Sequence, residues 1–532
     1  MKNRILFSAA LLCCTACSSQ LQGPNLVPTT PSTSPNYWCT WYAQNYWQQR
    51  GGEIKDFNKI NNPNAREEIN YKNVFDAKEG WATTYLPRGR EDYYFLIDHG
   101  WQTKEEDERL KGAAPFFSLQ IDVRDFPEYA EARPEEQLRL FNEEIKSMGW
   151  KGLGIWVRGN VSPELAETFV EWSKYAGIEY WKIDGGDTKA FNAYEAKKRL
   201  YPELQLEYVA PAGNINPNWD KPGLTAYPSI YESNSAHKAA TLQVLQHSDV
   251  FRTYDASPQL MSTTTLRRTH DILKMTAGHP EYISVLNLQD DCNAAPALGC
   301  LIASKRHPNF NERLLDGKDL HHQLNGKRHM QGRTNEAERA GRWFRIAPAF
   351  ACGQGTYEAS EKELVDCFPY DKYSTWNSAT YGKTVYQSAP AIMARNMALP
   401  IVQTDEKEEP YVMATTYPDG AICVATEGRV QPENEWFYPL ADVTIEAKGT
   451  AHPIGIFGYY KSLKIQFAED LGQVKHVWAQ DLLADASTDI KKEIKIEDRA
   501  IIIPGEVIKR IGTAAASKND ISAPGLVLKI EK

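Results

Sequence analysis

Short apolar runs alternate with segments of helical periodicity between residues 150 and 290. The apolar runs lie at 152–157, 178–183, 204–209, 250–254 and 282–288. Ser162 and Pro163 begin one intervening helix and Gly177 ends it, as expected of an N-cap, a first-turn proline and a C-terminal glycine. Regular alternation of strand and helix predicts right-handed crossovers and a parallel sheet.

Three further apolar runs extend this pattern in both directions. They lie at 38–42, 93–97 and 346–351, which brings the expected strands to about eight, the number of a (β/α)₈ barrel. The fold class is therefore predicted to be α/β, with a TIM barrel over residues 37–404. Residues 292–340 are dense in His, Arg, Asn and Gly. We expect them to form a long excursion between the seventh and eighth strands.

The pattern changes after residue 405. Residues 405–410 are highly charged and end in proline, which is typical of a linker. Short alternating runs follow at 411–417, 421–426, 443–447, 463–467, 500–503 and 526–530, with turn residues between them. This pattern predicts hairpins without helices, and therefore a C-terminal antiparallel β-sandwich over residues 405–532.

The N-terminus has the pattern of an export signal. Lys2 and Arg4 precede an apolar stretch at 5–12 and small residues before Cys17, which predicts a signal peptide over residues 1–16. The stretch 14–17 (CTAC) resembles a bacterial lipobox, which implies lipidation of Cys17 and a membrane anchor. Residues 17–36 would then be a flexible tether. The run after Cys17 lacks acidic residues, which favours the periplasmic face of an outer membrane; an ordinary cleaved signal is the alternative.

Composition excludes some classes of partner. The chain has 60 Lys and Arg against 69 Asp and Glu, a net charge of −9, which argues against nucleic-acid binding. Six cysteines lie beyond the signal region; Cys292 with Cys300, or Cys352 with Cys367, could close short disulfide loops. The histidines at 321, 322 and 329 lack acidic or cysteine partners at ligand spacing. We therefore expect no metal and no cofactor.

Several apolar runs end in an aspartate. These aspartates are Asp98, Asp122, Asp184 and Asp255. Aspartate is common after strands as a turn former, so each alone has a structural interpretation. However, functional side chains of barrels gather where the strands end, and Asp184 and Asp255 would face one mouth. Two carboxylates in this arrangement can serve glycoside hydrolysis as nucleophile and proton donor.

The neighbours of these two acids favour different roles. Lys182 lies two positions before Asp184 and would point to the same side of a strand, where its positive charge favours the ionised, nucleophilic carboxylate. Asp255 would have to carry a proton, which burial beside Tyr254 and repulsion from Asp184 would favour. Arg252 would oppose this if it points inward, and its direction stays open.

Five short motifs occur in sequence between residues 97 and 255. They are IDHGWQ at 97–102, FP at 126–127, GWKGLGIW at 149–156, YWKID at 180–184 and RTYD at 252–255. Together they resemble glycoside hydrolase clan D, especially the family 27 and 36 α-galactosidases, over about residues 37–365. The aromatic stretch 38–41 and the acids Asp290 and Asp291 resemble the first and seventh strands of those enzymes.

The resemblance implies a retaining exo-α-glycosidase acting on a carbohydrate, with Asp184 as nucleophile and Asp255 as acid/base. The sugar subsite would be lined by Trp41, Asp98, His99, Trp101, Trp156, Lys182 and Arg252. The family usually has a second acid where this chain has His99, and Arg252 precedes Asp255 by three residues rather than four. The sugar therefore stays open between galactose, N-acetylgalactosamine, β-L-arabinopyranose and α-glucose types, with Asp187 and Asp249 as alternative acids.

Aromatic residues favour carbohydrate binding, either by a glycosidase or by a protein without catalytic activity. Trp41, Trp101, Trp156 and Trp181 fall at or near strand ends, where flat rings can stack on sugars. A non-catalytic carbohydrate-binding lipoprotein is therefore the alternative from a different class, because a fold alone does not fix a function.

Overall fold

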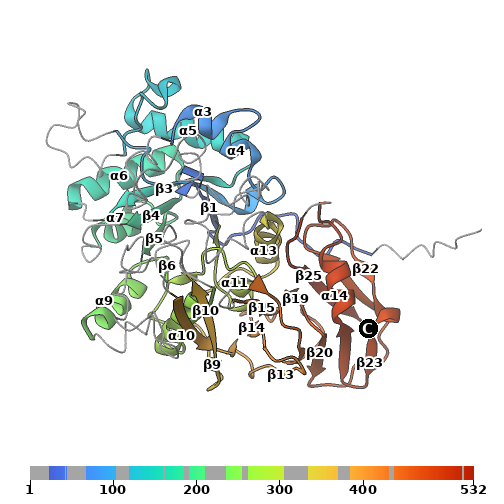
Figure 1. Ribbon diagram of the computed structural model, residues 1–532. Coiled ribbons are helices and arrows are strands. Elements are labelled where there is room, and N and C mark those ends of the chain that lie inside the picture. The colour runs from blue at the N-terminus through green and yellow to red at the C-terminus, as the bar shows by residue number, and fades with distance from the viewer. Residues whose placement is uncertain are drawn as a thin grey trace, which may run out of the picture.

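The computed structural model contains two β-sheet domains (Figure 1). It describes residues 23–41, 43–44, 68–103, 119–159, 162–184, 191–209, 235–253, 262–304, 333–369, 384–430, 436–517 and 520–532. Cys17, Asp187, Asp255 and the three histidines at 321, 322 and 329 lie outside these residues.

Eight parallel strands form the sheet of the N-terminal domain, in the order β7-β6-β5-β4-β3-β2-β1-β8. Their bounds are β1 (Tyr37–Cys39), β2 (Tyr94–Ile97), β3 (Gly152–Arg158), β4 (Tyr180–Asp184), β5 (Gln205–Val209), β6 (Val250–Arg252), β7 (Val285–Asn287) and β8 (Ala303–Ser304). A parallel bridge between Asn287 and Leu301 joins the two ends of the sheet. The predicted TIM barrel is confirmed.

Helices lie between these strands. The principal ones are α5 (Pro134–Ser147), α6 (Pro163–Ala176), α7 (Asn192–Leu200), α9 (Ser235–Gln246), α10 (Ser262–Thr276) and α13 (Thr334–Ile346). Shorter ones are α3 (Tyr71–Phe75), α4 (Trp81–Thr84), α11 (Ala294–Ala297) and the 3₁₀ turns η2 (Arg90–Asp92) and η5 (Pro127–Tyr129). The ends of α6 follow the prediction: the Ser162 side chain accepts a hydrogen bond from the Leu165 N–H, and Gly177 adopts φ 65°.

The eighth strand is not where the sequence analysis placed it. The run 346–351 lies at the end of α13 and beyond, and it contains no strand. Instead, β8 follows β7 closely, and residues 305–332 come after it rather than between the two strands. The prediction was wrong because β8 has only two residues, too few to produce a recognisable period.

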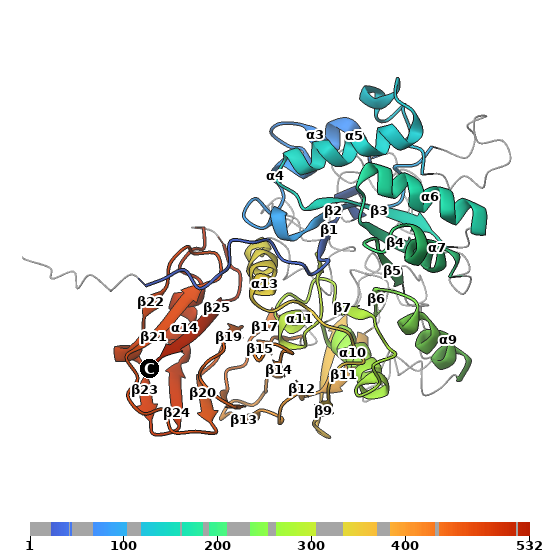
Figure 2. The same ribbon diagram turned by 180° about the vertical axis from the view of Figure 1, so that it is seen from behind.

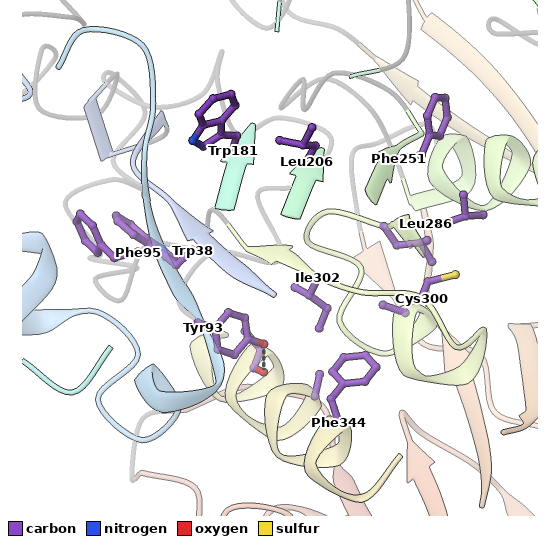
Figure 3. Close-up of a cluster of buried hydrophobic side chains, with 14 of the residues drawn as sticks. Trp38, Tyr93, Phe95, Trp181, Leu206, Phe251, Leu286, Cys300, Ile302 and Phe344 are labelled. Carbon is purple, nitrogen blue, oxygen red and sulfur yellow. Dashed lines mark hydrogen bonds between the residues drawn. The ribbon is translucent and has the colours of Figure 1, made fainter. Parts of the chain in front are cut away.

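Adjacent residues of each barrel strand face opposite sides of the sheet. Figure 3 shows large apolar side chains from successive strands gathered in a buried cluster, among them Trp38, Phe95 and Trp181. A separate buried cluster contains their chain neighbours Tyr37, Tyr94 and Tyr180. This alternation places the first group towards the helices and the second inside the barrel.

The C-terminal domain is a sandwich of two mixed sheets, seen beside the barrel in Figure 2. The larger sheet has the order β22-β21-β25-β19-β15-β14-β12-β9 and the smaller β13-β18-β20-β24-β23. Their strands are β9 (Tyr357–Ala359), β12 (Ile392–Arg395), β13 (Ile401–Gln403), β14 (Tyr411–Thr416), β15 (Ile422–Glu427), β18 (Asp442–Ala447), β19 (Ile454–Phe457), β20 (Ser462–Phe467), β21 (His476–Asp481), β22 (Thr488–Asp489), β23 (Lys495–Glu497), β24 (Ala500–Pro504) and β25 (Gly525–Glu531). Two hairpins lie outside these sheets: β10 (Glu363–Pro369) with β11 (Thr384–Pro390), and β16 (Arg429–Val430) with β17 (Trp436–Phe437). The domain also contains the helix α14 (Gly505–Gly512) and the turn η10 (Lys491–Glu493). The prediction of a region without helices was therefore wrong.

The six strands predicted beyond residue 405 are all present, but the predicted domain boundary is too late. Strands β9 and β12 already belong to the large sandwich sheet, and residues 405–410 connect β13 of one sheet to β14 of the other. The sandwich is predominantly antiparallel, with three parallel pairs (β12–β14, β15–β19 and β18–β20).

Residues 23–36 differ from the flexible tether that their composition predicts. At one end, Gly23 N donates to Ser487 O (2.8 Å) and Ser487 N donates to Pro24 O (3.1 Å), both at the sandwich. At the other, Ser32 N donates to Asp92 Oδ1 (2.8 Å), and Lys151 Nζ donates to Ser32 O (2.8 Å) at the barrel. The segment therefore contacts both domains.

Two other expectations concern the cysteines and the membrane. Cys39, Cys292, Cys300, Cys352, Cys367 and Cys423 are all buried free thiols, so neither disulfide considered above is formed. Among the described helices, none is both long and apolar enough to cross a bilayer.

Candidate active site

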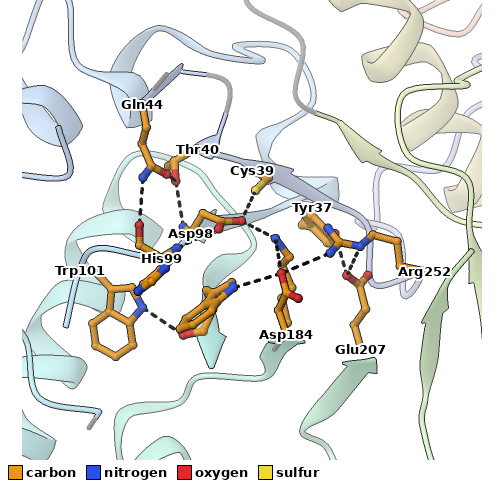
Figure 4. A network of polar contacts seen from close by, with 12 residues as sticks. Tyr37, Cys39, Thr40, Gln44, Asp98, His99, Trp101, Asp184, Glu207 and Arg252 are labelled. Carbon is orange, nitrogen blue, oxygen red and sulfur yellow. Dashed lines mark hydrogen bonds and ion pairs between the residues drawn. The ribbon is translucent and has the colours of Figure 1, made fainter. Parts of the chain in front are cut away.

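Lys182 lies at the centre of the predicted site. Its Nζ atom is 2.5 Å from Asp98 Oδ2 and 3.8 Å from Asp184 Oδ2. Lys182 and Asp184 therefore share a face of β4, as their spacing predicts. Lys182 therefore contacts both acids, and Figure 4 shows Asp98 and Asp184 within one network of polar contacts.

Asp98 is held by several donors at the end of β2. Its Oδ2 accepts from Cys39 Sγ (3.1 Å), and its Oδ1 accepts from the His99 N–H (2.8 Å). Its own N–H donates to Thr40 Oγ1 (2.9 Å). Because Asp98 is also buried, these contacts fix its carboxylate and, through it, the Lys182 ammonium group.

Three nitrogen atoms converge on Oδ2 of Asp184, one as a hydrogen-bond donor and two in ion pairs. They are Trp156 Nε1 at 3.4 Å, Arg252 Nη2 at 3.7 Å and Lys182 Nζ at 3.8 Å. The Asp184 side chain is 28% exposed, whereas that of Lys182 is 3% and that of Arg252 is 0% exposed. The Asp184 carboxyl group therefore lies close to two buried cations, and a molecule in the barrel mouth can reach it.

The charge of Lys182 depends on these acids. Burial and the nearby Arg252 guanidinium act to lower the pKa of Lys182, but Asp98, Cys39 and Asp184 outweigh them and raise that pKa above its ordinary value. Lys182 therefore stays positively charged in the barrel interior.

Arg252 points inward, which the sequence left open. In the register of the sheet, Arg252 pairs with Val209 on β5 and with Asn287 on β7. Its Nη2 faces Asp184, and its Nε lies 3.8 Å from Glu207 Oε1. Sequence reasoning missed Glu207, although one signal was available: it is the charged residue in an otherwise predominantly apolar strand.

The predicted aromatic residues divide into two groups. The His99 and Trp156 rings stack, with centroids 4.2 Å apart and an interplanar angle of 9°. Trp101 is fully buried and donates its indole N–H to Trp156 O (3.1 Å), so it supports Trp156 and offers no free face. Trp181 is likewise buried, and donates to Ser173 on α6. The partly buried Trp41 packs against the barrel-interior cluster.

Two acids considered with the site have structural partners. Both carboxylate oxygens of Asp122 contact Arg124, and in the described residues 119–121 before it only Ile121 pairs, in an isolated bridge with Gln102. Asp249 lies before β6, at the opposite end of that strand from the site, and pairs with Lys197 (2.7 Å). The structure therefore does not bring Asp249 together with Asp184. No cluster of His, Cys, Asp and Glu suitable for a metal occurs among the described residues.

Neither protein-family models nor curated proteins match the chain. Among solved structures, it is similar to a family 51 α-L-arabinofuranosidase from Bifidobacterium longum, with 8% identity over 84% of this chain and 92% of that chain and a TM-score of 0.29. It is also similar to a noncanonic maltogenic α-amylase from Thermotoga neapolitana, with 9% identity over 88% and 96% of the two chains and a TM-score of 0.31. The fold assignment rests on the strand order of the barrel itself, and the function is argued from the site.

Proposed function

We propose that this protein is a retaining glycoside hydrolase that removes a terminal α-linked sugar, with Asp184 as the nucleophile. The observation that carries the proposal is the convergence of Trp156, Lys182 and Arg252 on one oxygen of a partly exposed carboxylate at the carboxyl end of β4. Catalytic side chains of barrel enzymes lie at this end, and a retaining glycosidase requires an ionised carboxylate there.

The reaction would proceed by two displacements. Asp184 attacks the anomeric carbon while Asp255 gives its proton to the leaving oxygen, so the glycosidic bond breaks and an ester to Asp184 forms. Water then attacks the same carbon, Asp255 takes its proton, and Asp184 leaves as a carboxylate. Asp255 lies outside the described residues and is assigned from its place in the sequence, three residues after Arg252, the last residue of β6.

The sugar is proposed from the resemblance and the ring contacts. Galactose or a close stereochemical relative fits the clan D motifs. In this chain, His99 occupies the place of the usual second acid and stacks on Trp156. A neutral or cationic ring there binds hydroxyl groups differently from a carboxylate, so N-acetylgalactosamine, β-L-arabinopyranose and α-glucose remain part of the proposed range.

A panel of nitrophenyl α-glycosides, together with the β-L-arabinopyranoside, tests this proposal. We expect release of nitrophenol from at least one sugar, retention of anomeric configuration by NMR, and loss of turnover by about 10³-fold or more in Asp184→Asn. Asp485→Asn, an exposed acid of the sandwich, is the matched control and should retain wild-type rates. Binding of sugars without release of nitrophenol from any substrate would instead indicate a carbohydrate-binding protein.

We also propose that the chain is exported and anchored to the cell envelope through a lipid on Cys17, with the domains on the periplasmic face of an outer membrane. The lipobox resemblance supports this. Membrane fractionation of wild-type protein and Cys17→Ser tests it: wild-type protein should sediment with membranes, and the variant should be soluble. Accessibility to added protease in intact cells distinguishes the two faces.

A further inference from the structure

Arg252 lies between two carboxylates, and the proposed reaction uses only one of them. Its Nη2 is 3.7 Å from Asp184 Oδ2, and its Nε is 3.8 Å from Glu207 Oε1. Figure 4 shows Glu207 beside Arg252, further from the Asp98 end of the network than Asp184. Arg252 and Glu207 are both 0% exposed, so this second contact lies wholly inside the barrel.

Glu207 is held by hydrogen bonds from three other strands. Tyr37 OH on β1 donates to Oε1 (2.9 Å), and Tyr180 OH on β4 and Asn287 Nδ2 on β7 donate to Oε2 (2.9 and 2.6 Å). Burial and the proximity of Glu207 raise the pKa of both tyrosines well above the ordinary value, so both remain hydroxyl donors. A buried carboxylate with this many donors is held in one position.

The charges of the network change during the proposed reaction. Its described charged groups are two cations, Lys182 and Arg252, and three carboxylates, Asp98, Asp184 and Glu207. When Asp184 becomes an ester, its negative charge is lost. Lys182 is then still paired with Asp98, and Arg252 is still paired with Glu207. Without Glu207, Arg252 would be a buried cation lacking this anion, which is costly in a low-dielectric interior.

We infer that Glu207 is a positioning residue: it shares the Arg252 guanidinium with Asp184, so that it limits the interaction of Arg252 with Asp184, and it balances the charge of Arg252 while Asp184 is esterified. This inference rests on the proposed function, in which Asp184 is the nucleophile. Glu207 itself touches neither substrate nor reacting atoms; it acts through Arg252.

The pH dependence of kcat/KM separates this role from simple packing. In Glu207→Gln, Arg252 interacts more strongly with Asp184, so the ionised carboxylate is favoured and becomes less nucleophilic. We expect the acidic limb of the profile to move to lower pH by about one unit, and the plateau of kcat/KM to fall. Glu179→Gln is the control, because Glu179 also accepts from a tyrosine, Tyr94 OH at 2.9 Å, and has no described contact with Arg252.

A second variant, which keeps the buried Glu207 carboxylate, should move the acidic limb of the kcat/KM profile in the opposite direction. Tyr180→Phe removes one donor from Glu207, so Glu207 attracts Arg252 more strongly and Arg252 stabilises Asp184 less. The acidic limb should then move to higher pH. If Glu207→Gln does not fold, the pH profile of Tyr180→Phe alone tests the inference. A limb that stays in place in every variant that folds overturns the inference.

An equilibrium measurement keeps the test independent of turnover. The unfolding equilibrium constants of Glu207→Gln, Arg252→Met and the double variant form a cycle, and we expect the two substitutions to deviate from additivity by more than about tenfold. Additive effects would mean that Glu207 does not hold Arg252. Absence of turnover in wild-type protein would defeat the proposed function, and this cycle would still decide whether Glu207 positions Arg252.

Discussion

Arg339 on α13 and Asp481 on β21 form a fully buried, two-point ion pair between the barrel and the sandwich. Nε lies 2.9 Å from Oδ1 and Nη2 lies 3.0 Å from Oδ2. Removing one partner of a buried pair leaves the other charge uncompensated, which costs about 3–5 kcal/mol. We therefore expect Arg339→Met to lower the free energy of unfolding by this amount in urea denaturation.

The matched control for this prediction is an exposed pair of the sandwich. Arg510 contacts Glu493, and both side chains are substantially exposed. Such pairs contribute about 1 kcal/mol or less, so Arg510→Met should scarcely change stability. Equal losses in the two variants would contradict the assigned role of Arg339 in joining the domains.

Trp156→Phe tests the indole contact with Asp184. Phenylalanine retains an aromatic ring to stack with His99 but removes the N–H that lies 3.4 Å from Asp184 Oδ2. Loss of one such hydrogen bond costs about 1 kcal/mol, so kcat/KM should fall by about fivefold. Trp478→Phe removes a comparable indole–carboxylate bond, to Glu531 in the sandwich, and should not affect turnover. An unchanged rate in Trp156→Phe would mean that this contact does not assist the reaction.

Glu338 should make the free energy of unfolding decrease as pH rises. Burial raises the pKa of Glu338 from its ordinary 4.5 to about 7, although the Arg88 N–H, a donor to its Oε1 at 2.7 Å, opposes the shift. Between these values the unfolded chain releases its proton and the folded protein retains it. The unfolding free energy should therefore decrease as pH rises from about 4.5 to about 7, by at most about 1.4 kcal/mol per pH unit.

Urea titrations across this pH range check the Glu338 prediction. Glu338→Gln should lack this decrease, whereas Glu506→Gln, at an exposed position of α14, should follow the wild-type curve. Parallel curves for wild-type protein and Glu338→Gln would exclude Glu338 as the source.

His270 should make the free energy of unfolding decrease as pH falls. Burial, together with the cations Arg267 and Lys274, lowers the pKa of His270 from 6.5 to about 4. As pH falls between these values, the unfolded chain binds a proton that the folded protein does not, so the unfolding free energy should decrease towards acid. His270→Gln should remove this decrease, and His452→Gln, at an exposed position, should retain it. The same urea titrations measure both.

The barrel was predictable because its signals are local. The cap at Ser162, the stop at Gly177 and the apolar runs each lie within one turn or strand. The eighth strand was missed because β8 has two residues and is defined by pairing with β1, a contact distant in sequence. The sandwich boundary was placed too late for the same reason: β9 and β12 are recognisable as sandwich strands only by their partners.

The candidate site was predictable where spacing alone determines direction. Lys182 and Asp184, two residues apart on one strand, point the same way and lie within 4 Å. The ring faces of Trp101 and Trp181 were not predictable, because position at a strand end does not reveal which neighbours cover a side chain. Glu207 was missed because its role arises from contacts with side chains of four other strands, which meet only in the closed barrel.

The segment 23–36 gives the molecule a defined response to mechanical force. Tension applied to the chain ahead of Gly23 first acts on the paired hydrogen bonds between residues 23–24 and Ser487, at the sandwich. The hydrogen bond from Leu26 N to Gln480 Oε1 (2.6 Å) is the next contact with the sandwich, and we expect the contacts of Ser32 with Asp92 and Lys151 to carry load only after these bonds have broken. We therefore expect the sandwich attachment to break before β1, which carries Tyr37 and Cys39, comes under load.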